Sequence, residues 1–302
     1  MTSNESISQP TSLPKELALN VWSSERENPF NQLTRFSYFS LVLLSQGAIE
    51  LKADVSSYTV KAPAVLFFSP YQPFKFGTAQ PEELQLSVVN FHPDFFCILK
   101  HQQEVSCNGV LFNNLYEAPF VSLSSEQLQL LSVQIQQMAE ELQQEALAQH
   151  DLLLSYLKIF LIHTTRYKKQ VDAQKAADQQ GLPLPERSIL QKLKMSIEEH
   201  FLQEHAPSFY ADKLNISVKA LGKLTKQHVN RTLSDLIQER LMMEAKRELY
   251  LTDKSVKEIA YSLGFEDEYY FSRLFKKNTD TSPIQYRKTV GEDQARKLKI
   301  EY

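Results

Sequence analysis

Short apolar runs interrupted by turn-forming residues fill the first third of the chain. Between residues 33 and 91 these runs are RFSYFSLVLL, IELKADV, YTVK, AVLFFSP and LQLSVVNF, and Gly and Pro residues interrupt the region. Short apolar or alternating runs bounded by Gly and Pro are typical of β-strands. Several such strands with frequent turns indicate a small sandwich or barrel.

The spacing of apolar residues becomes helical after Ser124. Either Ser124 or Ser125 can cap a helix, with Glu126 and Gln127 in its first turn. Apolar residues then recur at steps of three and four, as in a short heptad seam, at Leu128, Leu131, Ile135, Met138 and Leu142. A second helix is predicted over residues 151–169. This helix pair either packs on its own barrel or forms a coiled-coil contact between two chains, and the short seam leaves both open.

These patterns of apolar and polar residues divide the chain into five segments and predict an α+β multidomain protein. The segment 170–185 is polar, rich in Ala and Gln and ends in two prolines, which is typical of a linker. Amphipathic helical patterns follow it. We predict a disordered arm over 1–20, a β-rich barrel with a helix pair over 21–169, the linker over 170–185, an all-α domain over 186–290 and a tail over 291–302.

The all-α part contains a unit that occurs twice, 50 residues apart. Each copy has a short helix, a tight turn and a second amphipathic helix, which is the pattern of a helix-turn-helix. The second helix of such a unit can lie in the major groove of DNA. The aligned pairs are Leu221–Lys226 with Phe271–Lys276, Ser217 with Asp267, and Asn230 with Asp280.

The residues at the turns of this unit suit their places. Ser217 and Asp267 are good N-caps for the second helices. Gly264 fits the tight turn of the second copy because glycine adopts positive φ without strain. Asn230 and Asp280, just past the second helices, are the residue types other than glycine that best tolerate the left-handed region.

Charge adds a weak indication of an anionic partner. The chain of 302 residues has a net charge of −3. From Pro185 onward, however, 21 Lys and Arg stand against 18 Asp and Glu, while the preceding part has 12 against 18. This asymmetry favours a C-terminal domain that meets an anion.

The C-terminal segment KSVKEIAYSLGFEDEYYFSRLFKKNTDTSPIQYR closely resembles the signature of AraC/XylS-type transcription regulators. The elements that carry the resemblance are Lys257–Ala260, Gly264-Phe265, Phe271–Lys276 and Pro283–Arg287. The resemblance covers roughly residues 185–290 and implies a seven-helix domain with two helix-turn-helix units.

Three positions depart from the family pattern. Members usually carry Gly at the positions of Asn230 and Asp280, and many carry a larger polar residue at that of Gly222. Glycine weakens a helix interior, which puts base contacts by the first unit in more doubt than those by the second.

The resemblance also implies which side chains meet DNA. Candidates for base edges are Lys219, Lys223, Glu268, Tyr269 and Arg273. Candidates for phosphates, further along each helix, are Lys226, Lys276 and Lys277. Arg273 could instead touch mainly phosphate, and Glu268 could face either a base or solvent. For Asp267 we favour a role as a helix cap.

For the front part, the family resemblance implies a cupin-like barrel over 21–169 that senses a small molecule or mediates dimerisation. Its many aromatic residues either form the core or line an apolar effector pocket. The pocket candidates are Phe36, Tyr38, Phe67, Phe74 and Phe76.

Patterns of catalysis and metal binding are missing from the sequence. No histidine precedes His92, so the predicted strands lack the His ligands of metal-dependent cupin enzymes. The chain has neither a phosphate-binding glycine loop nor a GxSxG elbow. Cys97 and Cys107 form no CxxC and are expected to be buried thiols. We expect no enzymatic activity, no metal and no cofactor.

The sequence also indicates a location. No run of 18 or more apolar residues occurs, and the first residues lack the basic-then-apolar order of a signal peptide. We therefore expect a cytoplasmic protein without a membrane partner.

Together these patterns predict a sequence-specific transcription regulator, more an activator than a repressor. The expected partners are double-stranded DNA, RNA polymerase, a small-molecule effector and a second copy of the chain. The alternatives are a ligand-binding cupin, or a protein-binding adaptor whose helical domain does not read DNA.

Overall fold

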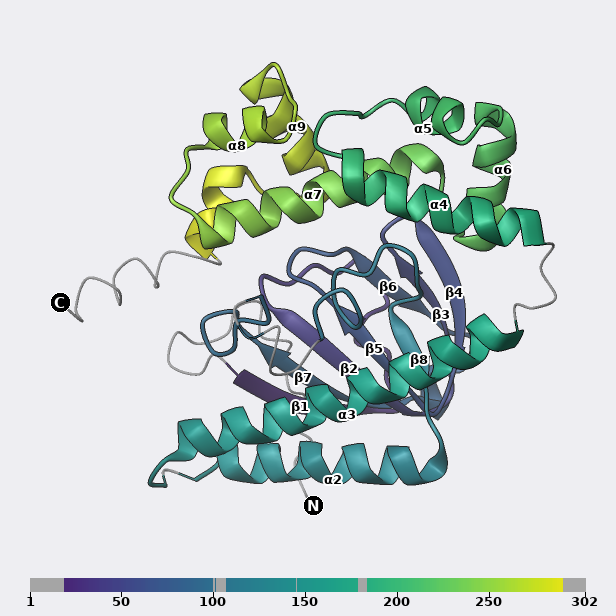
Figure 1. Cartoon of the computed structure of the whole chain (residues 1–302). Coiled ribbons are helices and arrows are strands. Elements are labelled where there is room, and N and C mark those ends of the chain that lie inside the picture. The colour runs from purple at the N-terminus through teal and green to yellow at the C-terminus, as the bar shows by residue number, and fades with distance from the viewer. Residues whose placement is uncertain (1–18, 100, 102–106, 145, 179–183, 290–302) are drawn as a thin grey trace.

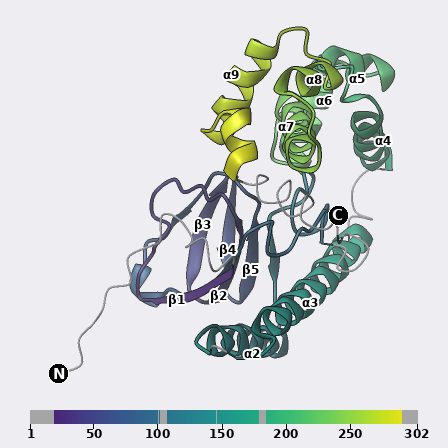
Figure 2. The ribbon, with the colours of Figure 1, turned by 90° about the vertical axis from the view of Figure 1, so that its left-hand side faces the viewer.

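The computed structural model describes residues 19–99, 101, 107–144, 146–178 and 184–289, which form two regions (Figure 1). We call residues 19–178 the front region and residues 184–289 the helical region. The helical region lies at one end of the front region, and helix α2 lies at the opposite end (Figures 1 and 2). The predicted tail (291–302) and the predicted arm (1–20), apart from Leu19 and Asn20, lie outside the described residues.

The strands of the front region form two antiparallel sheets. The five-stranded sheet has the order β1 (Leu19–Glu25), β7 (Gln85–Phe91), β2 (Phe39–Gln46), β5 (Ala64–Phe68), β8 (Phe120–Ser122). The three-stranded sheet has the order β4 (Ser56–Lys61), β3 (Ala48–Ala53), β6 (Phe74–Gly77), and the short 3₁₀ helix η1 (Pro81–Glu83) precedes β7. The predicted β-rich region is confirmed. The predicted cupin-like barrel is not, because the described strands form two sheets that are not closed on each other.

The five-stranded sheet is covered on both faces, which explains its uninterrupted apolar runs. In β2, Phe39, Leu41 and Leu43 pack toward α2 and α3, whereas Val42 and Leu44 belong to a second cluster. That second cluster includes Leu51 and Phe76 of the three-stranded sheet, so the two sheets share an apolar core without sharing ladder hydrogen bonds. A strand with both faces buried reads as a continuous apolar run.

The two helices of the front region pack on the five-stranded sheet. Helix α2 (Ser125–Leu142) begins with a capping box, in which Ser124 accepts from the Gln127 amide and the Gln127 side chain accepts from the Ser124 amide. Its seam residues Leu131, Ile135 and Met138 are buried in the cluster of the sheet. The seam therefore packs within the chain, as the first of the two interpretations requires.

Helix α3 (Gln149–Asp178) is longer than its predicted range of 151–169. It extends into the segment predicted as a linker, of which residues 179–183 lie outside the described part. Near the end of the predicted range, the buried ammonium of Lys168 donates to the carbonyls of Ala118 (3.0 Å) and Phe120 (3.1 Å). These bonds hold the later turns of α3 against β8.

Six helices and the helical segment 283–289 make up the helical region. They are α4 (Leu184–His200), α5 (Pro207–Lys213), α6 (Val218–His228), α7 (Leu233–Leu251), α8 (Val256–Ser262) and α9 (Glu268–Thr279). Their buried apolar residues form one cluster around α7. Within the described residues, no helix is both long and apolar enough to cross a bilayer.

Candidate nucleic-acid interface

The first helix-turn-helix unit consists of α5 and α6. Ser217 caps α6, because its Oγ accepts from the Ala220 amide at 3.2 Å. Leu221 and Thr225 are buried on the inner side of α6. Three lysines on the same helix are exposed: Lys219, Lys223 and Lys226.

The second unit consists of α8 and α9. Asp267 caps α9, because its Oδ1 accepts from the Tyr269 amide at 2.8 Å. Phe271 and Phe275 are fully buried, and Arg273, on the same helix, is exposed. Both units thus bury one side of the second helix and leave basic side chains in solvent.

Gly264 forms the tight turn before α9. Its φ is +79°, and a Cβ at this position would lie 2.2 Å from the backbone carbonyl oxygen of Leu202. Both observations require glycine, the first by conformation and the second by close approach. The turn of the second unit therefore lies directly against the loop that joins α4 to α5.

The turns that follow α6 and α9 have the same backbone conformation. Asn230 has φ 58° and Asp280 has φ 57°. Both lie in the left-handed region that the sequence pattern indicated. Asn and Asp are the residue types other than glycine that best tolerate this region.

The candidate DNA-contacting residues lie on α6 and α9, the second helices of the two units. Tyr269 is 69% exposed, and Glu268 is half-buried at the start of α9. The basic candidates are all exposed and make no ion pair within the described part of the chain: Lys219, Lys223, Lys226, Arg273, Lys276 and Lys277. Their positive charges are thus not neutralised by described residues.

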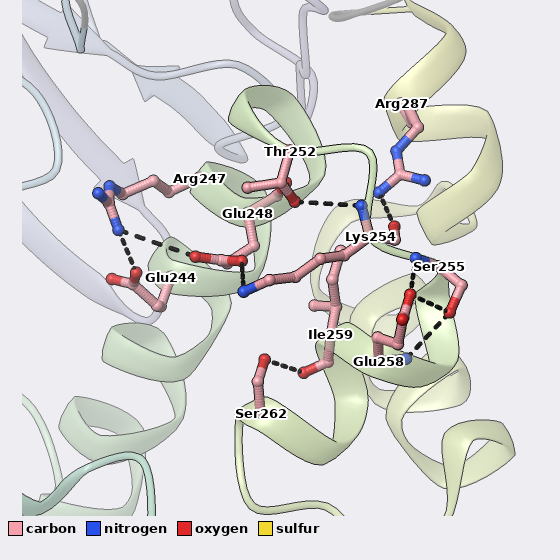
Figure 3. Close-up of polar contacts among 10 residues, drawn as sticks. All are labelled: Glu244, Arg247, Glu248, Thr252, Lys254, Ser255, Glu258, Ile259, Ser262 and Arg287. Atoms are coloured by element: carbon pink, nitrogen blue, oxygen red, sulfur yellow. Dashed lines mark hydrogen bonds and ion pairs between the residues drawn. The ribbon is translucent and has the colours of Figure 1, made fainter.

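Polar contacts hold α8 to the end of α7 (Figure 3). Ser255 and Glu258 form a capping box at the start of α8, and their hydrogen bonds lower the pKa of Glu258. Lys254 Nζ pairs with Glu248 of α7 at 2.6 Å. Arg287 donates to the carbonyls of Leu249 (3.2 Å) and Lys254 (2.5 Å). The second unit is therefore tied to α7 from both of its ends.

Four of the five aromatic residues proposed for an effector pocket pack in one aromatic cluster, and Phe67 lies apart from them. Phe74 and Phe76 are buried in the core between the two sheets, and Phe67 is buried on the other face of the five-stranded sheet. Phe36 stacks on Tyr38 with ring centroids 4.7 Å apart. Their arrangement fits the core interpretation that the sequence left open.

A cavity of about 450 Å³ lies instead between the two regions. Helix α7 lines much of one side of it, through residues that include Arg240, Lys246 and Tyr250. The other side is lined by the front region, through Phe39 of β2 and loop residues that include Pro70 and Ile98. Burial lowers the pKa of Lys246 to about 8, because a low-dielectric site disfavours the charged amine. The cavity was not predicted, since it exists only where segments distant in sequence meet.

The described residues contain no group of three or more His, Cys, Asp or Glu that could hold a metal ion. Within the described residues neither Cys97 nor Cys107 forms a disulfide, and both are buried; burial raises the pKa of the Cys107 thiol to about 12.

Comparison with known proteins found a matching family model, curated relatives and similar solved structures. Residues 210–289 match the family model of a helix-turn-helix domain. An "HTH-type transcriptional activator RhaS" from Enterobacter sp. (strain 638) is 29% identical over 162 residues, which are 54% of each protein. The chain thus spans about half the length of the curated relatives it matches. The resemblance inferred from the sequence is confirmed for the helical region.

Solved structures give two further likenesses. The C-terminal domain of AraT, a response regulator from Geobacillus stearothermophilus, is 32% identical over 34% of this chain and 86% of that one, with a TM-score of 0.33. ToxT from Vibrio cholerae O395 is 17% identical over 90% of this chain and 97% of that one, with a TM-score of 0.39.

A glycine pair tests the turn of the second unit. We expect Gly264→Ala to lower the free energy of unfolding by about 2 kcal/mol or more, because it adds both strain and a backbone clash. The matched control is Gly222→Ala in α6, where a Cβ would meet nothing within 4 Å. That variant should gain about 0.5–1 kcal/mol, since alanine favours a helix. Urea denaturation measures both, and equal effects would contradict the assigned role of Gly264.

Proposed function

We propose that this chain, whose C-terminal region belongs to the AraC-type helix-turn-helix family, is a sequence-specific DNA-binding regulator of transcription. One observation carries the proposal. Two helix-turn-helix units in one region present exposed cations, without described ion-pair partners, on both second helices, α6 and α9. A chain with two such helices can engage two successive major-groove segments, about 34–36 Å apart.

On each of the two helices, the early side chains are placed to contact bases and the later side chains to contact phosphates. Arg273 suits the O6 and N7 acceptors of guanine, and Lys219 and Lys223 suit the same acceptors in the first half-site. Glu268 can accept from cytosine N4, and Tyr269 lies beside it at the start of α9. Lys226, Lys276 and Lys277 stand later on their helices and contact phosphate, which contributes affinity and salt dependence.

The relatives are named activators, and we propose by analogy that this chain also activates transcription, through contact with RNA polymerase.

Exposed apolar side chains on α2 and α3, including Val133 (48%) and Ile159 (43%), favour contact with a second copy of the front region. Sedimentation of the full chain decides between monomer and dimer.

A small-molecule effector is proposed for the cavity against α7. Its volume lies in the range of ordinary ligand sites, and it combines apolar walls with a few charged groups. A ligand in this cavity would contact both regions, so its binding free energy can depend on the relative position of the front region and the helical region. A true effector should raise the melting temperature of the wild-type protein but not that of Met243→Trp, whose larger side chain fills the cavity. Equal stabilisation of both proteins would place the ligand elsewhere.

Selection from a random duplex library gives the first test of DNA reading. We expect an enriched site with two short blocks one helical turn apart. Arg273→Ala should weaken binding to that site about tenfold or more and relax the preference in one block, because a bidentate Arg–guanine contact is lost. Lys223→Ala should act on the other block. Unchanged affinity and unchanged preference in both variants would reject the proposed function and favour the protein-binding alternative.

Salt dependence separates base contacts from phosphate contacts. Lys276→Ala should weaken binding to all duplexes alike and reduce the slope of log affinity against log salt by about 1. Titrations of one selected and one scrambled duplex at several salt concentrations measure this. Lys52→Ala, on β3 of the front region, is a control that removes the same positive charge away from α9. A sequence-dependent loss in Lys276→Ala would assign Lys276 to base reading instead.

A further inference from the structure

The first helix-turn-helix unit touches the front region at the turn that joins α6 to α7. Asn230 Nδ2 donates to the carbonyl of Ser57 at 3.1 Å, and Ser56 Oγ donates to the carbonyl of Asn230 at 3.3 Å. Ser56 and Ser57 begin strand β4. The end of the β3–β4 hairpin therefore lies directly against the end of the first recognition helix.

Arg231, the next residue, carries a charge into this contact. Its side chain is only 4% exposed. Its Nη1 donates to the carbonyl of Leu115 at 2.7 Å and to Glu239 Oε2 at 2.6 Å, and its Nε donates to Ser56 Oγ at 3.2 Å. Leu115 and Ser56 belong to the front region, whereas Glu239 lies on α7. One guanidinium thus binds both regions at once.

The pKa values of two carboxyl groups beside Arg231, those of Asp54 and Glu239, depend on its positive charge. Asp54 of the front region lies 4.0 Å from Arg231 Nη2, and Gln72 donates to the same carboxylate at 2.6 Å. Burial raises the pKa of Asp54 and raises that of Glu239 to about 8, and in both cases the charge of Arg231 opposes the rise. Glu239 Oε1 is buried and has no hydrogen-bond partner. Removing Arg231 would leave two buried carboxyl groups without their main counter-charge.

The second unit has no such contact at the equivalent place. The 50-residue repeat aligns Arg231 with Thr281, which is uncharged. Asp280, the equivalent of Asn230, does pair with Arg35 of the front region, but its side chain is 63% exposed. An exposed ion pair contributes little, whereas breaking a buried and hydrogen-bonded one is strongly unfavourable. The charged contact that matters energetically is therefore at the first unit.

We infer that Arg231 is the residue that anchors the first helix-turn-helix unit to the front region, so that the front region sets the position of recognition helix α6. Arg231 is buried and directly precedes Thr232, the N-cap of α7, so it acts by positioning rather than by touching DNA. Its consequence for DNA binding rests on the proposed function.

Helix α7 links this anchor to the cavity. Glu239, the partner of Arg231, and Lys246 lie on α7, and Lys246 lines the cavity while donating to the carbonyl of Pro70 at 3.2 Å. At the far end of α7, the ring of Tyr71 in the front region lies 5.0 Å from that of Tyr286. A ligand in the cavity would therefore contact α7, the helix that joins both units. Its site would lie between the Arg231 contact and the Tyr71–Tyr286 contact, the two points at which the front region holds the helical region.

Differential scanning calorimetry of the full chain tests the anchor. The wild-type protein should unfold in one transition, because the two regions are coupled, and Arg231→Met should split it into two. The matched control is Arg287→Met, since the side-chain bonds of Arg287, to the carbonyls of Leu249 and Lys254, stay within the helical region. That variant should lower the transition temperature but keep one transition. A single transition in Arg231→Met, or two in the wild-type protein, would overturn the inference.

A neutral triple variant keeps the test sound if Arg231→Met fails to fold. Asp54→Asn, Arg231→Met and Glu239→Gln together remove the charge of the anchor and those of its two carboxylate partners, so the fold should persist while the two transitions remain. Its affinity for the selected duplex should differ from wild type by about fivefold or more, the usual size of coupling between sites. Asp280→Gly, which keeps the left-handed turn, should leave affinity unchanged.

The outcomes separate the two proposals. Wild-type affinity in the triple variant, together with one transition, would reject the anchor. Absence of DNA binding by the wild-type protein would reject the proposed function, while the calorimetry would still decide the role of Arg231.

Discussion

The burial of helix α7 is the constraint on which the helical region depends. Seven of its residues are buried: Leu233, Leu236, Ile237, Leu241, Met242, Ala245 and Leu249. Both helix-turn-helix units pack on this one helix, and their buried residues join the same cluster. Neither short helix pair could be stable alone, since helices of this length need tertiary packing. The apolar face of α7 therefore determines where both recognition helices sit.

The same packing separates the two faces of each recognition helix. In α9, the burial of Phe271 and Phe275 leaves Arg273 in solvent, and in α6 the burial of Leu221 and Thr225 does the same for Lys223. Side chains three or four positions apart share a helix face, so an apolar stripe fixes the face left for charges. The charge of the exposed side of each helix is thus a consequence of core packing, and the caps Ser217 and Asp267 set where each face begins.

Contact with the front region uses a buried guanidinium at the start of α7, and a pair of rings together with further hydrogen bonds near its far end. Arg231 brings a buried charge and several directional hydrogen bonds to its end. Tyr71 and Tyr286 bring ring packing to the opposite end. Directional bonds to a charged group favour one geometry more strongly than apolar contact does. The front region contacts α7 near both of its ends, and the cavity lies between the two regions along this helix. A ligand bound there would therefore contact the helix on which both units pack.

Local patterns in the sequence were sufficient for the repeated unit, its caps and its left-handed turns. Ser217, Asp267, Asn230 and Asp280 take the predicted roles because capping and turn geometry depend on neighbours within a few residues. Apolar runs were likewise sufficient for β2, β3, β4, β5 and β7, whereas no run indicated β1, β6 or β8. The closure of the sheets, the full length of α3, the cavity and the role of Arg231 were decided only in the folded chain. Each depends on contacts such as Arg231 with Leu115, between residues far apart in sequence, and periodicity carries no information about such pairs.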